Sequence, residues 1–194
     1  MTDIVKILAG ELGIKTAQVE ATIKLIDEGN TIPFISRYRK EVTGSLNDEI
    51  LRQFDERLKY LRNLEEKKTQ VLSAIEEQGK LTDELKKEIE DAITLVAVDD
   101  LYRPFRPKRR TRAMIAVEKG LEGFANDIFE EKLEKDATDE AKKYLSDKEG
   151  LEVETEADAI AGAMDIIAEK ISDDAGFRNK IRDLSFKQGI LTSV

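Results

Sequence analysis

The sequence contains no cysteine and no histidine among its 194 residues. Without cysteine, the chain cannot be a disulfide scaffold and offers no thiolate for chemistry. Without histidine, it lacks the commonest metal ligand and the usual general base near neutral pH. Most hydrolase mechanisms therefore lose their central residue, and we expect a protein that is not an enzyme and needs no cofactor.

Tryptophan is also absent, and the chain has only three prolines and 11 glycines. Charged residues make up 38% of the chain and apolar residues 40%, a balance typical of helices with one buried and one solvated face. No apolar run reaches the length of a membrane span, and residues 1–12 do not resemble a secretory signal. The sequence therefore predicts an all-α, cytoplasmic protein with no membrane partner.

Apolar spacing and capping residues divide the chain into three predicted parts. Residues 1–44 form a lobe of short helices, residues 45–97 a long helical hairpin, and residues 98–194 a C-terminal helical lobe. The prediction is thus two small helical lobes joined by a long antiparallel hairpin.

Each side of the hairpin is expected to be one continuous helix. The first has caps available at residues 45–47 and runs to Gln78, a rod of about 45 Å at 1.5 Å per residue. Its stretch 65–70 is polar on every face, so we expect separate apolar clusters before and after it. Thr82 caps the return helix, whose apolar positions continue to Val96.

The C-terminal lobe is expected to contain helices capped by Thr111 and Thr155, a surface helix over 138–146, and a last helix capped at 172–173. The Thr155 helix is rich in small residues, which implies close packing against its neighbours. Its small apolar positions include Ala159 and Ala163.

The most informative feature is a concentration of positive charge in residues 103–112, which we call the basic segment. Six cations occur in these ten residues, although the whole chain has a formal net charge of −9. Two prolines stiffen the segment and favour an extended backbone, rather than helix, at the preceding residues Arg103 and Arg106. The end of the segment leads into the helix capped by Thr111. The cations are Arg103, Arg106, Lys108, Arg109, Arg110 and Arg112.

A second group of cations, the Arg37 cluster (residues 37–40), follows a short helix that begins near Pro33. Its cations are Arg37, Arg39 and Lys40, and Tyr38 lies between them. The apolar neighbours Phe34, Ile35 and Val42 imply that this cluster is partly buried, which favours an intramolecular role for its cations. The two groups are the candidate nucleic-acid-binding residues.

Three interpretations of this positive charge remain open. The cations pair with acidic helix faces of the same chain, such as Glu65-Glu66 or Glu130-Glu131; or they contact RNA or DNA phosphates without base specificity; or they dock on other domains or on a polymerase. Tyr38 and Phe105 are able to stack on bases, although aromatic residues so placed are more often core residues.

The sequence offers little evidence for a metal site or a catalytic motif. The adjacent pairs Asp99-Asp100 and Asp173-Asp174 offer carboxylates, but neighbours in a helix point in different directions, and the second pair suits a helix start. No phosphate-binding loop, nucleophile elbow or zinc spacing is present. We expect no metal site.

Two blocks of the sequence resemble the N-terminal region of the bacterial Tex family. Residues 25–44 read LIDEGNTIPFISRYRKEVTG and residues 100–112 read DLYRPFRPKRRTR. Shorter stretches agree in the same order, at 58–62, 76–81, 166–169 and 171–174. Phe105 stands where tyrosine is expected and Ser36 where alanine is frequent; neither changes the chemistry.

The resemblance implies a cytoplasmic transcription accessory factor, related to a eukaryotic elongation factor, whose N-terminal part is helical with a helix-turn-helix-like element. It also implies that this sequence stops before the RNase H-like, helix-hairpin-helix and OB-fold RNA-binding domains of the family. Nucleic-acid affinity in the family is attributed chiefly to the OB-fold domain, so binding by this fragment alone is expected to be weak.

The expected function is therefore a non-catalytic helical region that contributes nucleic-acid contacts or docks other parts of the system. The implied protein partners are the downstream domains of the full-length protein and RNA polymerase or ribosome-associated machinery. The rival hypothesis is a protein–protein interaction scaffold that binds its partner through the long hairpin and does not bind nucleic acid directly.

Overall fold

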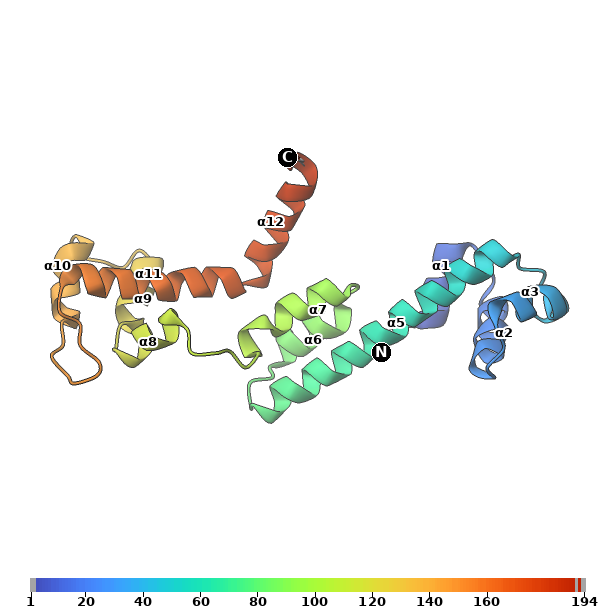
Figure 1. Ribbon diagram of the computed structural model, residues 1–194, viewed down its shortest axis with the longest axis horizontal. Coiled ribbons are helices and arrows are strands. Elements are labelled where there is room, and N and C mark those ends of the chain that lie inside the picture. Colours follow the sequence, from blue (N-terminus) through green and yellow to red (C-terminus); the bar gives the residue numbers. More distant parts are fainter. Residues whose placement is uncertain (1–2, 191, 193–194) are drawn as a thin grey trace. The chain divides into compact units, whose positions relative to one another are not determined.

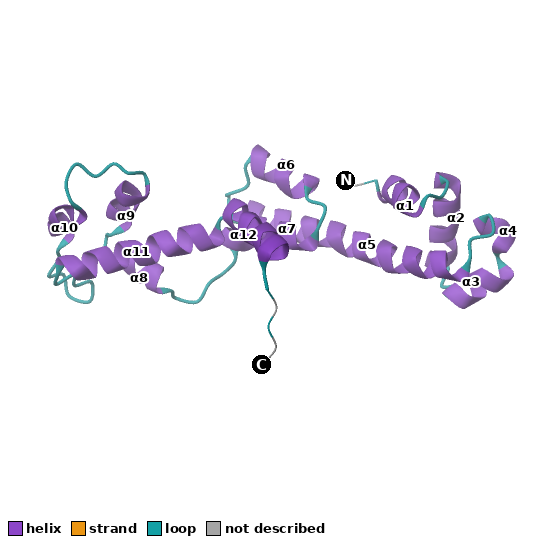
Figure 2. Cartoon of the chain, turned by 90° about the horizontal axis from the view of Figure 1, so that it is seen from above, coloured by secondary structure: helices purple, strands orange, loops and turns teal. Residues whose placement is uncertain are grey.

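The computed structural model describes residues 3–190 and residue 192. Within that range the chain forms α-helices and two short 3₁₀ helices, with no β-strand and an isolated β-bridge between Ser146 and Val153 (Figure 1, Figure 2). The all-α prediction is confirmed. The chain divides into two compact units, residues 1–98 and residues 99–194. The three-part division at residues 44 and 97, like the helix-turn-helix-like element, stays a prediction.

The first unit is built around one long helix. Its helices are α1 (Ile4–Leu12), α2 (Thr16–Asp27), α3 (Ile32–Tyr38), α4 (Lys40–Thr43), α5 (Asp48–Glu77) and α6 (Asp83–Asp91), and α7 (Leu95–Tyr102) begins in it. The side chain of Asn47 caps α5 by accepting a hydrogen bond from the Ile50 backbone N–H at 2.8 Å. Phe54, Leu58 and Leu61 of α5 are buried against α1 and α2, so the start of the long helix forms the core of this unit.

Every residue in the stretch 65–70 of α5 is polar, as predicted, yet one face of this stretch is buried. Lys68 is buried, and its Nζ donates a hydrogen bond to the Glu90 carbonyl oxygen at 2.7 Å. Its aliphatic stem therefore continues the buried stripe from Leu64 to Val71, while its ammonium group satisfies a carbonyl in the last turn of α6. A lysine takes the place of an apolar residue because both ends of its side chain find suitable surroundings.

The return side of the hairpin is also not one continuous helix. It breaks into α6 and α7 at residues 92–94, where Ala92 has an extended backbone. The Thr94 hydroxyl accepts a hydrogen bond from the Ala97 N–H at 3.1 Å, and the Tyr60 hydroxyl of α5 accepts one from the Leu95 N–H at 3.2 Å. These two oxygens accept hydrogen bonds from amides at the start of α7, which explains why a new helix begins here.

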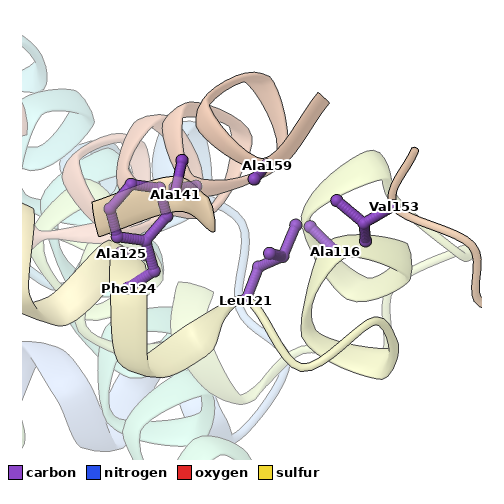
Figure 3. Close-up of a cluster of buried hydrophobic side chains, with 8 residues drawn as sticks. Ala116, Leu121, Phe124, Ala125, Ala141, Val153 and Ala159 are labelled. Carbon is purple, nitrogen blue, oxygen red and sulfur yellow. The ribbon is translucent and has the colours of Figure 1, made fainter. Parts of the chain in front are cut away.

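The core of the second unit packs against one helix, α11 (Glu156–Asp173). After the 3₁₀ helix η1 (Arg103–Phe105) come α8 (Arg112–Glu118), α9 (Glu122–Phe129), α10 (Ala137–Ala141), the 3₁₀ helix η2 (Lys142–Tyr144), α11 (Glu156–Asp173) and α12 (Ala175–Gln188). Figure 3 shows the buried cluster, in which Phe124 and Leu121 lie with small residues of the neighbouring elements. A Cβ added at Gly162 of α11 would lie 2.4 Å from Leu121 Cδ1, so α11 packs as closely as its small residues predict.

Two predicted elements near the C-terminus differ from the structure. The expected surface helix over 138–146 is only α10 followed by η2, because Ser146 pairs with Val153 instead of continuing the helix. The last helix is capped by Asp174, not at 172–173, and its Oδ1 accepts a hydrogen bond from the Phe177 N–H at 2.8 Å. Helix α12 has no buried residue, and Phe177, Ile181 and Leu184 are exposed along it.

Candidate nucleic-acid interface

The basic segment runs from the end of α7 into α8, as its cap residue predicts, but Arg103 lies in η1 instead of having the predicted extended backbone. Pro104 lies in η1, after which Arg106 has an extended backbone. The Thr111 hydroxyl caps α8 by accepting a hydrogen bond from the Met114 N–H at 3.1 Å. The same hydroxyl donates to Glu169 Oε2 at 2.8 Å, so the end of the segment is joined to α11.

Two cations of the segment donate hydrogen bonds to carboxylates of α11. Arg103 Nε donates to Asp173 Oδ1 at 3.0 Å, and Lys108 Nζ donates to Glu169 Oε1 at 2.7 Å and also to Asp173. Burial lowers the pKa of Lys108, but the hydrogen bonds to Asp173 and Glu169 outweigh it and raise the pKa above its ordinary value of 10.5. Lys108 is therefore a charged, internally paired residue at physiological pH.

The other four cations differ widely in their surroundings. Arg106 pairs with Asp99, and its guanidinium lies 5.5 Å from the centre of the Tyr102 ring. Arg110 pairs with Glu118. Arg112 lies 3.3 Å from Asp165 but remains 85% exposed, and Arg109 is exposed and makes no ion pair within the described residues. Arg109 and Arg112 are thus the most accessible cations of the segment.

The carboxylates that bind the segment are not those expected from the sequence. Instead of Glu65-Glu66 or Glu130-Glu131, they come from α7, α8 and α11; Glu130 itself pairs with Lys132. The participating residues are Asp99, Glu118, Asp165, Glu169 and Asp173. Pairing within the chain is therefore present, with different partners.

An ion network at Asp100 was missed in the sequence, where Asp99-Asp100 was weighed only as a metal site. Arg178 Nε and Arg182 of α12 donate to the two oxygens of Asp100, each at 2.6 Å, and the residue is only 6% exposed. Burial raises the pKa of Asp100, but the hydrogen bonds from the two arginines lower it by more. The pKa of this carboxyl therefore lies below its ordinary value of 3.8. The i, i+4 spacing of the two arginines was the available sequence signal.

The Arg37 cluster has different surroundings. Ile35 is buried and anchors α3, and the side chain of Gln18 in α2 donates to the Thr43 carbonyl oxygen at 2.9 Å, which fixes α4. Arg39 lies 5.1 Å from the centre of the Phe34 ring and donates to the Tyr38 carbonyl oxygen at 3.1 Å. The predicted partial burial therefore applies to Arg39.

The remaining members of the cluster face solvent. Arg37 and Lys40 are exposed, and neither makes an ion pair within the part of the chain that the structure describes. Tyr38 is 61% exposed and Val42 44% exposed. The cluster thus presents two cations and an aromatic ring on a fixed backbone.

Neither basic group is associated with a metal site or a membrane span. Residues 3–190 and 192 contain no group of three potential metal-binding side chains. Across the same residues, no helix combines the length and the apolar character needed to cross a bilayer. Asp173 binds cations of the basic segment and Asp174 caps α12, so this pair has a structural role.

Comparison with known proteins identifies the family. The Tex-like protein N-terminal domain matches residues 2–76, and the Tex central region matches residues 132–194. The chain is 44% identical to YdcI of Bacillus subtilis over 96% of this chain and 26% of that protein. It is 46% identical to the transcriptional accessory protein Tex of Neisseria gonorrhoeae, over 93% of this chain and 23% of that protein.

A more distant relative has a name that mentions RNA. The chain is 33% identical to S1 RNA-binding domain-containing protein 1 of Pongo abelii, over 94% of this chain and 18% of that protein. The chain spans about a quarter of the length of the bacterial relatives. Because two Tex family models match in order and the identity extends over nearly the whole chain, the protein belongs to the Tex family.

Proposed function

We propose that this region is a non-catalytic part of a transcription accessory protein and that its accessible cations contact the phosphates of RNA or DNA. The observation that carries the proposal is the presence of exposed cations without a carboxylate partner in a chain of net charge −9. In the two basic groups these are Arg37, Lys40 and Arg109, and Arg112, which lies beside Asp165, is still 85% exposed. Unpaired cations gain most from a polyanion because they give up no internal ion pair.

The arrangement favours phosphate contact over base recognition. Arginine and lysine side chains that neutralise phosphates release counterions, which gives affinity without sequence preference. The exposed ring of Tyr38 offers a surface on which one unpaired base can stack. The printed names of two relatives, a transcriptional accessory protein and an S1 RNA-binding domain-containing protein, support this interpretation.

The test is binding of labelled single-stranded RNA and duplex DNA across a salt series. Two variants remove accessible cations, Arg37→Gln/Lys40→Gln and Arg109→Gln/Arg112→Gln. The matched control is Arg52→Gln/Lys59→Gln, which removes two exposed cations that pair along α5 with Asp48 and Asp55. All three variants change the net charge equally.

We expect binding that weakens steeply with salt and that is reduced by at least one of the first two variants but not by the control. Each lost phosphate contact should also lower the magnitude of the salt slope by about one. If the folded protein does not bind either nucleic acid at low salt, the proposal is wrong, and the cations serve protein docking instead. Equal loss in all three variants would mean that only net charge matters.

A further inference from the structure

Three carboxylates form a regular row along α11. Asp165, Glu169 and Asp173 recur every fourth residue, so successive carboxylates are about 6 Å apart along the helix axis at 1.5 Å per residue. We call these residues the carboxylate row. A row of evenly spaced negative charges is also what a polynucleotide backbone presents.

Each member of the row binds a cation of the basic segment. Asp165 lies 3.3 Å from Arg112, Glu169 accepts a hydrogen bond from Lys108 at 2.7 Å, and Asp173 accepts one from Arg103 at 3.0 Å as well as one from Lys108. The cations follow the row in reverse order, from Arg112 at its first member to Arg103 at its last. The basic segment therefore lies along the row.

The contact between the segment and the row is polar and open to solvent. A pocket of about 380 Å³ lies between them, lined by residues of both, including Arg112, Asp165 and Glu169. The side chain of Arg112 is 85% exposed and that of Lys108 is 23% exposed. The exposed pair of Arg112 with Asp165 contributes little net free energy, so a polyanion is able to replace it first. The pairs of Lys108 with Glu169 and Asp173 are only partly exposed and are replaced after it.

We propose that the carboxylate row is an internal competitor that occupies the basic segment in place of a phosphodiester backbone. This inference rests on the proposed function and adds a regulation to it. Nucleic acid reaches the outer cations Arg109 and Arg112 first, and engages Lys108 and Arg103 only when it displaces the row. Binding by the basic segment is therefore weaker than its six cations alone would give.

The test neutralises the row with Asp165→Asn, Glu169→Gln and Asp173→Asn together. The matched control is Asp48→Asn, Asp55→Asn and Asp139→Asn, which changes the net charge equally but removes carboxylates that pair only with cations three or four residues away. Dissociation constants are measured for single-stranded RNA and for duplex DNA at low salt, and circular dichroism and thermal melting check the fold.

We expect the row variant to bind at least one of the two nucleic acids roughly fivefold more tightly than the control, which is a modest change on the affinity scale. Adding Arg109→Gln/Arg112→Gln to the row variant should remove most of that gain. If the triple variant does not fold, Asp165→Asn alone is used, since its partner Arg112 is already exposed; about a twofold gain is expected, and none would contradict the inference.

The outcomes separate this inference from the proposed function. If the wild-type protein binds nucleic acid and the row variant binds no better than the control, the internal competitor is excluded and the proposed function stands. If neither the wild-type protein nor the folded row variant binds, both are wrong. If only the row variant binds, the internal competitor is supported and the proposed function is wrong for the wild-type protein, whose accessible cations then do not bind nucleic acid while the row occupies the segment.

Discussion

The two basic groups of this protein differ in a way that their composition does not suggest. The basic segment has six cations in ten residues, yet all but Arg109 lie beside a carboxylate of the same unit. The Arg37 cluster has three cations, and two of them, Arg37 and Lys40, make no ion pair within the described residues. The stretch with the greater charge density is therefore the one whose charge is more fully neutralised.

This difference separates two roles for positive charge. In the basic segment, cations join the end of α7 and the start of α8 to α11, so they contribute to tertiary structure. In the Arg37 cluster, Ile35, Phe34 and the hydrogen bonds of Gln18 supply the structural contacts, and the exposed cations are not needed for them. Charge density along a sequence thus does not indicate how much of that charge stays accessible in the folded chain.

The largest expected effect concerns Asp100, the buried carboxylate that joins α7 to α12. Asp100→Asn should lower the free energy of unfolding by about 2 kcal/mol, because it removes the charge that accepts from both Arg178 and Arg182. Asp99→Asn is the matched control and should cost less than about 1 kcal/mol, because its pair with Arg106 is exposed. Urea denaturation of both variants measures the difference. Equal losses would show that the burial of Asp100 has no energetic consequence.

Low pH should remove the stabilisation that the Asp100 carboxylate contributes. The pKa of Asp100 is lowered in the folded protein, so its contribution is fully present above the ordinary value of 3.8 and is lost as the pH falls through the lower native pKa. The difference in stability between the wild-type protein and Asp100→Asn should therefore be constant near neutral pH and shrink below about pH 4. Thermal melts at a series of pH values measure it. A difference that grows toward low pH would contradict the assignment.

A smaller effect is expected inside the segment. Lys108→Met should lower the free energy of unfolding by about 1 kcal/mol, since the ammonium group that lies between Glu169 and Asp173 is only partly exposed. The methionine keeps most of the apolar stem, so the loss reports the charge. Urea denaturation at low and high salt measures it, and the loss should be smaller at high salt. A loss that does not depend on salt would indicate a packing defect.

Much of the fold was predictable because helix ends are determined locally. Thr82, Thr111 and Thr155 each accept a hydrogen bond from an amide three residues along the chain, so the sequence near each cap contains the needed information. The break before Leu95 was not predictable in the same way, because it depends on the hydroxyl of Tyr60, 35 residues away. Burial of Lys68 likewise depends on a carbonyl of α6.

The candidate site, too, was predictable only where it depends on local sequence. The position of the basic segment and its entry into α8 follow from its own residues, but its partners Glu169 and Asp173 lie 61 and 65 residues from Lys108 in the sequence. The spacing of Glu169 and Asp173 with Asp165, four residues apart in α11, shows that they share a helix face, but it does not indicate that this face lies against the basic segment. Tertiary contacts therefore decide which cations remain accessible.

The smallest expected effect on stability concerns the exposed cations of the Arg37 cluster. Arg37→Met and Lys40→Met should each change the free energy of unfolding by less than about 0.5 kcal/mol, because neither side chain has an ion pair to lose. Arg39→Met, the internal control, should cost about 0.5 to 1 kcal/mol, since it removes the contact with the Phe34 ring. The three variants are compared by urea denaturation. If Lys40→Met destabilised the protein as much as Lys108→Met, the cations of the Arg37 cluster would be structural too, and the contrast between the two groups would not exist.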